Sequence, residues 1–423
     1  MRVSSLVLVL FGAGGLAFSP VGSSPGRISL GQVANPNFKK PPLAVAVAKL
    51  YRKYNKTIPE GLANAVKRHS AKLPMNRMSN GTGTAAAIPG LDDVEYLTPI
   101  SIGSPPQILP LDIDTGSSDL WVFSTMTPKS MVNGQTLYNP NASTTAKFMN
   151  GSSWWIFYGD GSDGRGSVYT DVVSFGNLSF PKQAVQVAEE VSASFTRDSS
   201  NSGLLGLGFS IGNTILPEAQ PTFFDNINSS LELPVFTADL MHHAPGTYNF
   251  GYIDHTAYTG NISYSPVDES HSWWMFNMSG FAIGNETFHK VQLKSIADTG
   301  SSVMMMDTRL VKMYWAQVAG AKFSTDWWGY VYPCNATLPD LVLGTNTSHT
   351  QRDQPLRIPG ALMEYGYADT KGQPGVCIGG LQDGPQFNLN IIGDTALKAA
   401  FVVHEKGPVG NSRIGFANKR VRL

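Results

Sequence analysis

Cysteine and charge are both scarce in this chain of 423 residues, which contains two cysteines and 15% charged residues. Two cysteines cannot form a zinc site by themselves, and no histidine pair at ligand spacing accompanies them, so we predict no metal and no cofactor. Signatures of phosphate-binding loops, dinucleotide folds and nucleic-acid binding are absent, and we expect no nucleic-acid partner. The 42% hydrophobic content is enough to bury a large core in two or more units.

Long apolar runs are missing after the first twenty residues. The run from Leu6 to Leu16 is shorter than the ~20 residues that cross a membrane, and Pro20 closes it. Ala17-Phe18-Ser19 has the small residues of a cleavage site, so we predict a signal peptide over 1–19 rather than a membrane anchor. We expect a secreted, extracellular protein with no membrane partner, and the sequence leaves a vacuolar destination open.

Two covalent features agree with export. In an exported protein, Cys334 and Cys377 are more simply explained as one disulfide than as two free thiols. Asn-x-Ser/Thr sequons are glycosylated only in the secretory route, so their abundance also predicts a glycoprotein. The sequons begin at Asn55, Asn80, Asn141, Asn150, Asn177, Asn228, Asn261, Asn277, Asn285, Asn335 and Asn346.

The zero net charge hides an uneven distribution. Residues 20–90 carry eleven Lys or Arg and one acid, Glu60, whereas the chain from Leu91 onward carries 19 basic and 30 acidic residues. A basic tract can bind nucleic acid or an anionic membrane, but one that precedes an acidic body favours an intramolecular partner. We therefore predict a basic propeptide over 20–88 that docks on the rest of the chain and inhibits it.

The residue pattern changes along the chain. Residues 43–67 are rich in Ala, Val, Leu, Lys and Tyr and favour short helices, and 79–89 are small and linker-like. From Tyr96 onward, short apolar or alternating runs between Gly, Pro, Asn and Ser predict mostly β-strands. The best candidates for helices in this part are 222–228, 308–318 and 394–400.

An internal repeat lies in the β-rich part. Asp-Thr-Gly-Ser-Ser occurs at 114–118 and at 298–302, which are 184 residues apart. Two aliphatics and a glycine follow each copy, at 204–206 and at 391–393, after 92 and 95 residues respectively. One Asp-Thr-Gly is a weak signal because these are ordinary turn residues, but a duplicated order at near-equal spacing is a strong one.

The repeated residues suit acid–base chemistry. A strand that ends in Asp before Thr-Gly-Ser places a carboxylate at a tight turn, where hydroxyls can donate to it. Two such carboxylates facing each other cannot both ionise easily, so they share a proton: one activates a water as base while the other protonates a carbonyl. Merely turn-forming or calcium-binding aspartates would not explain the same hydroxyls at the same offsets.

The sequence resembles the pepsin family of aspartic proteases along essentially its whole length, and most closely the secreted fungal members. The resemblance implies an all-β, bilobal fold with the active-site cleft between an N-terminal lobe over 89–262 and a C-terminal lobe over 263–423. It also implies a monomer that binds polypeptide substrates extended in this cleft. The matching stretches are EYLTPISIGSPPQ, LDIDTGSSDLWVFST, YGDGSDGRGSVYTD, GLLGLGFS, IADTGSSVMMM and IIGDTALKAAFVVHE.

The resemblance assigns roles around the cleft. Asp114 and Asp298 are the expected catalytic pair. Tyr158-Gly159-Asp160 matches the hairpin flap that closes over the substrate, and Trp121 would brace the tyrosine. Ser117 and Ser301 are expected to hydrogen-bond the carboxylates. Gly116 and Gly300 are expected to let the substrate backbone approach. Phe195 and Leu204 match positions that line the pocket before the cut, with core packing as the alternative.

Two further acids bear on specificity. Asp112 lies two residues before Asp114 on the same strand face, and Asp160 lies in the flap. A carboxylate near the first pocket can pair with a substrate Lys, so we expect Lys to be accepted there besides large hydrophobic residues. Either acid can instead bond a backbone amide within a turn.

The resemblance also extends to the disulfide and to the propeptide. Cys334 and Cys377 match the single disulfide of the second lobe in the fungal enzymes. AKLYRKYNKTIPE resembles the Lys-Tyr stretch of fungal propeptides, and Lys53 with Tyr54 are the candidates for filling the cleft.

Other classes account for these residues less well. None of the eight histidines lies in a recognisable nucleophile motif, which argues against Ser-His-Asp catalysis. A glycosidase also uses two carboxylates, but at about 5 Å or more and without a shared proton. A catalytically weak, pepsin-like binding protein remains the alternative, although both Asp-Thr-Gly turns are intact.

Overall fold

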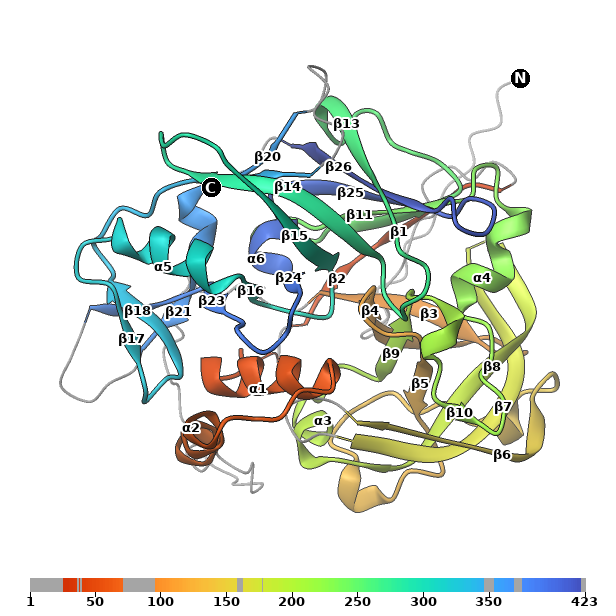
Figure 1. The fold of residues 1–423 in the computed structure, drawn as a ribbon. Helices are drawn as coiled ribbons and strands as arrows, with labels where there is room; N and C mark the ends of the chain where they lie inside the picture. The colour runs from red at the N-terminus through yellow and green to blue at the C-terminus, as the bar shows by residue number, and fades with distance from the viewer. Residues whose placement is uncertain are drawn as a thin grey trace, which may run out of the picture.

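The computed structural model is mostly β, which confirms the predicted fold class. Figure 1 shows the nine-stranded sheet in orange to yellow-green at one side of the molecule and the four-stranded sheet in blue at the other. Among the described residues, no helix is long and apolar enough to cross a membrane. The structure describes residues 26–35, 38, 40–70, 96–157, 163–176, 178–345, 354–368 and 375–419.

The strands between residues 96 and 216 form the nine-stranded sheet. One of its edge strands comes from the basic segment. Asp114 ends an interior strand of this sheet. In spatial order the strands are β10 (Ile215–Leu216), β6 (Lys147–Phe157), β7 (Asp163–Phe175), β8 (Leu178–Val191), β5 (Leu120–Phe123), β9 (Gly203–Gly206), β4 (Gln107–Asp114), β3 (Tyr96–Ile102) and β2 (Val33–Ala34).

The second half of the chain forms a seven-stranded and a four-stranded sheet. The first has the order β20 (Leu356–Ile358), β19 (Leu341–Gly344), β14 (Met275–Ile283), β15 (His289–Ala297), β24 (Asn390–Ile392), β16 (Met304–Met306) and β23 (Leu381–Asp383). The second has the order β17 (Lys322–Ser324), β18 (Gly329–Pro333), β22 (Val376–Gly379) and β21 (Glu364–Tyr367).

A six-stranded sheet combines both halves of the chain with the basic segment. The lobe boundary expected at residue 262 lies within one of its strands, so the two lobes share this sheet. Its order is β1 (Ile28–Gly31), β12 (Thr247–Phe250), β11 (Val235–Asp239), β25 (Ala400–Glu405), β26 (Arg413–Asn418) and β13 (Thr259–Pro266).

The sequence repeat corresponds to two equivalent strand pairs. In the first half, β4 runs parallel to β9, with Asp114 opposite Gly206. In the second half, β15 runs parallel to β24, with Ala297 opposite Ile392. Each Asp-Thr-Gly turn is therefore held beside the aliphatic strand that the repeat placed 92 or 95 residues later.

Three short helices occur where the sequence predicted them. The side chain of Thr222 accepts a hydrogen bond from the backbone of Asp225, and that of Asp307 accepts two from the first turn of the next helix, so both cap their helices. The third helix is shorter than predicted because the chain enters β25 at Ala400. These helices are α4 (Phe223–Ile227), α5 (Thr308–Ala316) and α6 (Asp394–Leu397), and α3 (Ala193–Arg197) precedes them.

The basic segment folds onto the body through two helices, α1 (Leu43–Lys53) and α2 (Glu60–Ser70). In Figure 1, α1 lies in red at the middle of the molecule, beneath β16 and β24. Its apolar face includes Val47, Leu50 and Tyr51, which pack in one core cluster with Met305, Ile391 and Phe387. Burial of an apolar side chain contributes about 1.5–3 kcal/mol, so this face anchors the segment in addition to its charge.

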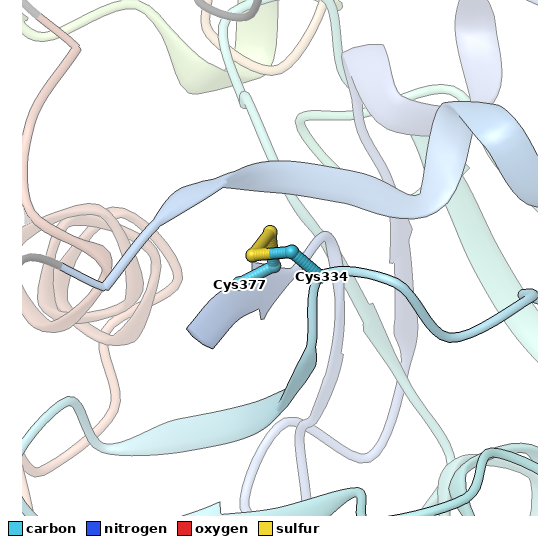
Figure 2. Close-up of a disulfide and its surroundings, with 2 residues drawn as sticks. All are labelled: Cys334 and Cys377. Carbon is cyan, nitrogen blue, oxygen red and sulfur yellow. A yellow bond between two sulfur atoms is a disulfide. The ribbon is translucent and has the colours of Figure 1, made fainter. Parts of the chain in front are cut away.

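The predicted disulfide is confirmed. Cys334 directly follows β18, and Cys377 lies in the neighbouring strand β22. Figure 2 shows the yellow bond between the two sulfur atoms, which joins these adjacent segments of the four-stranded sheet. Because the bridge spans 43 positions of sequence, the chain-entropy effect stabilises the fold by roughly 3–4 kcal/mol.

Candidate active site

The two predicted catalytic aspartates come together in the interior. Asp114 is the last residue of β4, and Asp298 directly follows β15. Both residues are almost fully buried, with exposed fractions of 1% and 0%. Each aspartate lies this deep because the apolar strand before it pairs with a parallel strand, and this pairing fixes the turn that contains the aspartate.

Two threonines lock the paired turns to each other. The Thr115 hydroxyl donates to the carbonyl oxygen of Ala297 at 2.8 Å, and the Thr299 hydroxyl donates to that of Ile113 at 2.6 Å. The backbone N–H of each threonine donates to the hydroxyl oxygen of the other at 3.1 Å. The sequence analysis missed this role, although the repeat contained both residues.

Each carboxylate is held by its own turn. The backbone N–H groups of Gly116 and Gly300 donate to Asp114 Oδ1 at 2.8 Å and to Asp298 Oδ1 at 3.0 Å. A Cβ atom at either glycine would collide with the aspartate of the opposite turn, so only glycine fits. The hydroxyl groups of Ser117 and Ser301 donate to Asp114 Oδ2 and Asp298 Oδ2, as expected from the sequence.

One ammonium from the basic segment lies between the two carboxylates. Lys53 Nζ donates to Asp114 Oδ1 at 2.8 Å and to Asp298 at 2.8 Å (Oδ1) and 3.0 Å (Oδ2). The Tyr54 hydroxyl donates to Asp298 Oδ2 at 2.6 Å. The two residues singled out in the sequence therefore occupy this site.

The charges in this site determine how it titrates. Burial by itself would raise the pKa of Asp298, but the charge of Lys53 and hydrogen bonds from Lys53, Ser301 and Tyr54 outweigh it and lower the pKa to about 2. Burial likewise opposes the charged form of Lys53, but the two carboxylates outweigh it and raise the lysine pKa. Burial and the charge of Asp298 raise the pKa of Tyr54.

Aromatic residues surround the Tyr54 ring. Trp273 packs edge-on against it at 4.9 Å between ring centroids, and Phe387 does so at 6.1 Å. Both come from segments of the second half that carry no repeated motif, so no sequence signal marked them. They form an apolar wall around the tyrosine whose hydroxyl donates to Asp298.

A cavity of about 210 Å³ lies between α1 and the body, and Asp112 lines it together with Lys49, Tyr248 and Gly300. Burial raises the pKa of Asp112 to about 8, against the opposing charge of Lys49. The Lys49 ammonium also donates to the carbonyl oxygen of Gly300 at 3.3 Å. Asp112 and Lys49 therefore line the same cavity, and Asp112 lies near enough to Lys49 and Asp114 for their charges to affect its pKa.

The remaining predicted pocket residues pack together in the first half of the molecule. Trp121 is fully buried and meets Phe195 edge-on, with 4.9 Å between ring centroids. Leu204 is buried in the same cluster, opposite Asp112 on the adjacent strand. Trp121 also stacks with Trp154 at 6.1 Å. Tyr158, Gly159 and Asp160 lie outside the described residues.

A buried aspartate pair between two halves that repeat the same strand–turn unit defines the class of aspartic proteases. Residues 95–419 match the family described as eukaryotic aspartyl protease, and the chain belongs to this family. It is an aspartic endopeptidase. The match covers both Asp-Thr-Gly turns and begins after the basic segment.

Curated relatives match nearly the full length of the chain. Endothiapepsin of Cryphonectria parasitica is 48% identical, covering 95% of this chain and 93% of that protein. Podosporapepsin of Podospora anserina is 44% identical, covering 93% and 91% respectively. Penicillopepsin-3 of Penicillium janthinellum is 42% identical, covering 85% and 87%. The resemblance to fungal pepsin-like enzymes is thereby confirmed.

Proposed function

We propose that the chain is the precursor of a secreted aspartic endopeptidase that acts at acid pH with Asp114 and Asp298 as its catalytic pair. The observation that carries this proposal is that Lys53 Nζ lies 2.8 Å from an oxygen of each carboxylate. Two carboxylates that share one ammonium are close enough to share one proton and one water after that ammonium leaves.

In the proposed reaction, the ionised member of the pair removes a proton from the shared water. The water oxygen bonds to the peptide carbonyl carbon while the protonated member gives its proton to the carbonyl oxygen. The C–N bond of the tetrahedral intermediate then breaks: the amine takes up the proton that the first aspartate had removed from the water, and one hydroxyl of the intermediate returns its proton to the other aspartate. No covalent bond to the enzyme forms. The hydrogen bonds from Gly116, Gly300, Ser117 and Ser301 hold the carboxylates for these steps.

The basic segment would keep this site inactive near neutral pH. Lys53 compensates the repulsion of the two carboxylates, and α1 fills the space that an extended substrate needs. The pKa of Asp298 is depressed in the docked state, so its contribution to docking is complete above the pKa that the carboxyl group has once the basic segment has left. It is lost as the pH falls towards 2, and protonation of other surface carboxylates weakens the attraction earlier.

Specificity would follow from the walls of the cleft. Trp273 and Phe387, which enclose the Tyr54 ring, suit a large hydrophobic side chain next to the cut. Asp112 lines one cavity with Lys49 in the precursor, so its carboxyl group is placed to accept a hydrogen bond from the ammonium of a substrate Lys there. Asp160 of the flap would contribute a second carboxylate for that lysine.

Processing would follow the organisation expected from the sequence. The signal peptide would be 1–19 and the propeptide 20–88, with cleavage between about 68 and 90. The docked helices α1 and α2 both belong to this propeptide, which supports its assignment as the intramolecular inhibitor. The Lys67-Arg68 pair is a candidate for a processing protease as an alternative to self-cleavage.

The test is to purify the precursor, shift it from neutral to acid pH, and follow its mass together with peptide cleavage. The precursor should be inactive at neutral pH and should gain activity as the propeptide is lost. An Asp114→Asn precursor controls for self-cleavage, and Asp298→Ala should lower turnover by at least about 100-fold without loss of the fold. Full activity of the uncleaved precursor at neutral pH would refute inhibition, and undiminished turnover by Asp298→Ala would refute the catalytic pair.

A further inference from the structure

A tryptophan pair lies under the second helix of the propeptide. The turn between β17 and β18, residues 325–328, contains Trp327 and Trp328 and is called the tryptophan turn below. In the precursor, Trp327 is 9% exposed and Trp328 is half-buried. The turn belongs to the body, so it remains when residues 20–88 are removed.

The backbone of the tryptophan turn holds an unfavourable conformation. Trp328 has a φ angle of 54°, in the left-handed region that bulky residues rarely adopt. Such a conformation costs on the order of 1–3 kcal/mol and persists where the surroundings enforce it. A glycine would serve this turn at no cost, so the position of the Trp328 indole is the feature that the turn maintains.

Helix α2 fits the tryptophan turn through one face. Leu62, Ala65 and His69 recur at helical spacing and are buried. A Cβ atom at Gly61 would overlap the ring of Trp328, so the indole packs directly onto the helix backbone. The His69 ring stacks on Trp327, with centroids 4.1 Å apart and planes inclined by 25°.

The polar groups beside the indoles are two backbone carbonyl oxygens, which accept hydrogen bonds, and one carboxylate. His69 Nε2 lies 2.9 Å from the carbonyl oxygen of Asp326, and Arg68 donates to that of Thr325 at 2.9 Å. The carboxylate of Asp326 is 78% exposed and lies 3.6 Å from the Arg68 guanidinium. This surface therefore accepts a polypeptide segment with small and apolar residues on one side and basic residues at its end.

The aromatic surface continues beyond α2. The Phe323 ring, 43% exposed, meets Trp328 at 5.7 Å and Tyr330 at 5.8 Å between centroids. None of these residues takes part in the hydrogen bonds to Asp114 or Asp298 described above. Once the propeptide is gone, the indoles and Phe323 form one apolar surface with an acid beside it, as is typical of an interaction site.

We propose that the tryptophan turn of the mature enzyme binds a basic amphipathic segment of the polypeptide substrate, outside the catalytic cleft. This inference rests on the proposed removal of the propeptide. The occupant is argued from α2, which seats Gly61 on Trp328 and His69 on Trp327, and places Arg68 beside Asp326. Leu62 and Ala65 of the same helix are buried in the core cluster that contains Trp327. Substrates that carry such a segment gain a second point of attachment, which raises their effective concentration at the cleft.

The first test compares two substrates with the same cleavable core. One carries residues 60–70 after a six-residue linker, the separation of Lys53 from Glu60, and the other carries the same segment with Leu62→Asp and Ala65→Asp. The intact segment should lower KM by about 5-fold with little change in kcat, and Trp328→Gly should remove that gain. Ile108→Ala, an exposed apolar change in the first half, should retain the gain.

Cleavage of the core peptide distinguishes the two proposals. If the mature enzyme cleaves the core but the intact segment gives no lower KM, the docking proposal is wrong and the proposed function stands. If Trp328→Gly raises KM or lowers kcat for the core and the extended substrates alike, the turn acts on the cleft rather than as a docking surface, and the proposal is also wrong.

A binding test needs no catalysis. A full-length precursor with Leu62→Asp and Ala65→Asp, which frees the tryptophan turn, should bind a labelled peptide of residues 58–70 in fluorescence anisotropy. The wild-type precursor and the same double variant with Trp328→Gly should not. Equal binding by all three proteins would overturn the proposal. Retention of the double variant on chitin, lost with Trp328→Gly and without peptide binding, would assign the surface to polysaccharide instead.

Discussion

Lys53 Nζ donates a 2.8 Å hydrogen bond to Asp298 Oδ1, although 245 positions of sequence separate the two residues. The lysine side chain is 4% exposed and the aspartate side chain is fully buried. A buried charge is tolerated only when it is paired, so the ammonium and the two carboxylates depend on one another in this structure. Removal of one of the three groups should therefore strongly destabilise the contact between the basic segment and the body.

Replacing Lys53 with Met should release the propeptide at milder acidity. The two carboxylates would then repel each other without compensation, and the docked state would lose its main charge contact. The pH at which half of the precursor has become active should rise by about one unit or more. Activity measured against pH checks this, with Lys56→Met as a control for the loss of one charge. Equal shifts in both variants would attribute the effect to net charge.

Replacing Thr299 with Val should weaken the contact between the two turns. The change keeps the shape but removes the hydroxyl that donates to Ile113 and accepts from the Thr115 N–H. A buried backbone donor left without a partner costs about 1–3 kcal/mol, and misplaced aspartates can slow turnover by up to about 100-fold. The Tm of thermal unfolding and kcat should both fall, whereas Thr259→Val, at an exposed position, should change neither. Wild-type kcat in Thr299→Val would show that the network is dispensable.

Replacing Asp160 with Thr should reduce cleavage after Lys far more than cleavage after Phe or Leu. The motivation is that a carboxylate in the flap would pair with the substrate ammonium. The ratio of kcat/KM values for matched Lys and Phe substrates measures this. Equal losses on both substrates would identify Asp160 as a turn residue.

His404 should make the fold sensitive to acid. The residue is fully buried in β25, stacked on Phe236 at 4.3 Å, and neither ring nitrogen has a hydrogen-bond partner among the described residues. Burial lowers its pKa to about 3. The unfolded chain, with a pKa of about 6.5, binds a proton first, so stability is complete above pH 6.5 and falls as the pH approaches 3.

At pH 4 this effect amounts to about 3 kcal/mol. In His404→Phe, the Tm measured at pH 7 and at pH 4 should therefore differ less than in the wild type. An exposed His255→Phe change is the control. The same acid-induced drop in Tm in wild type and His404→Phe would show that this histidine does not titrate on unfolding.

The sequence predicted the positions of short helices where the stabilising contacts lie within the helix itself. Thr222 and Asp307 cap helices that the sequence predicted, because a capping side chain bonds to the first turn of its own helix. The end of α6 was misplaced because β25 takes over the chain at Ala400, and that exchange depends on pairing with distant strands. The secondary-structure preferences of single residues do not predict pairing with distant strands.

The sequence by itself determined the two Asp-Thr-Gly turns and the aliphatic strands that repeat after them, because these follow from residue type and spacing. It also determined the disulfide, because Cys334 and Cys377 are the two cysteines of a chain that is expected to be exported. Only the tertiary structure decided that Thr115 and Thr299 bond across the two halves, that Trp273 encloses Tyr54, and that α2 covers Trp328. These contacts join segments far apart in the chain, and no local period or motif encodes them, since they arise when buried surfaces of separately formed units are packed together.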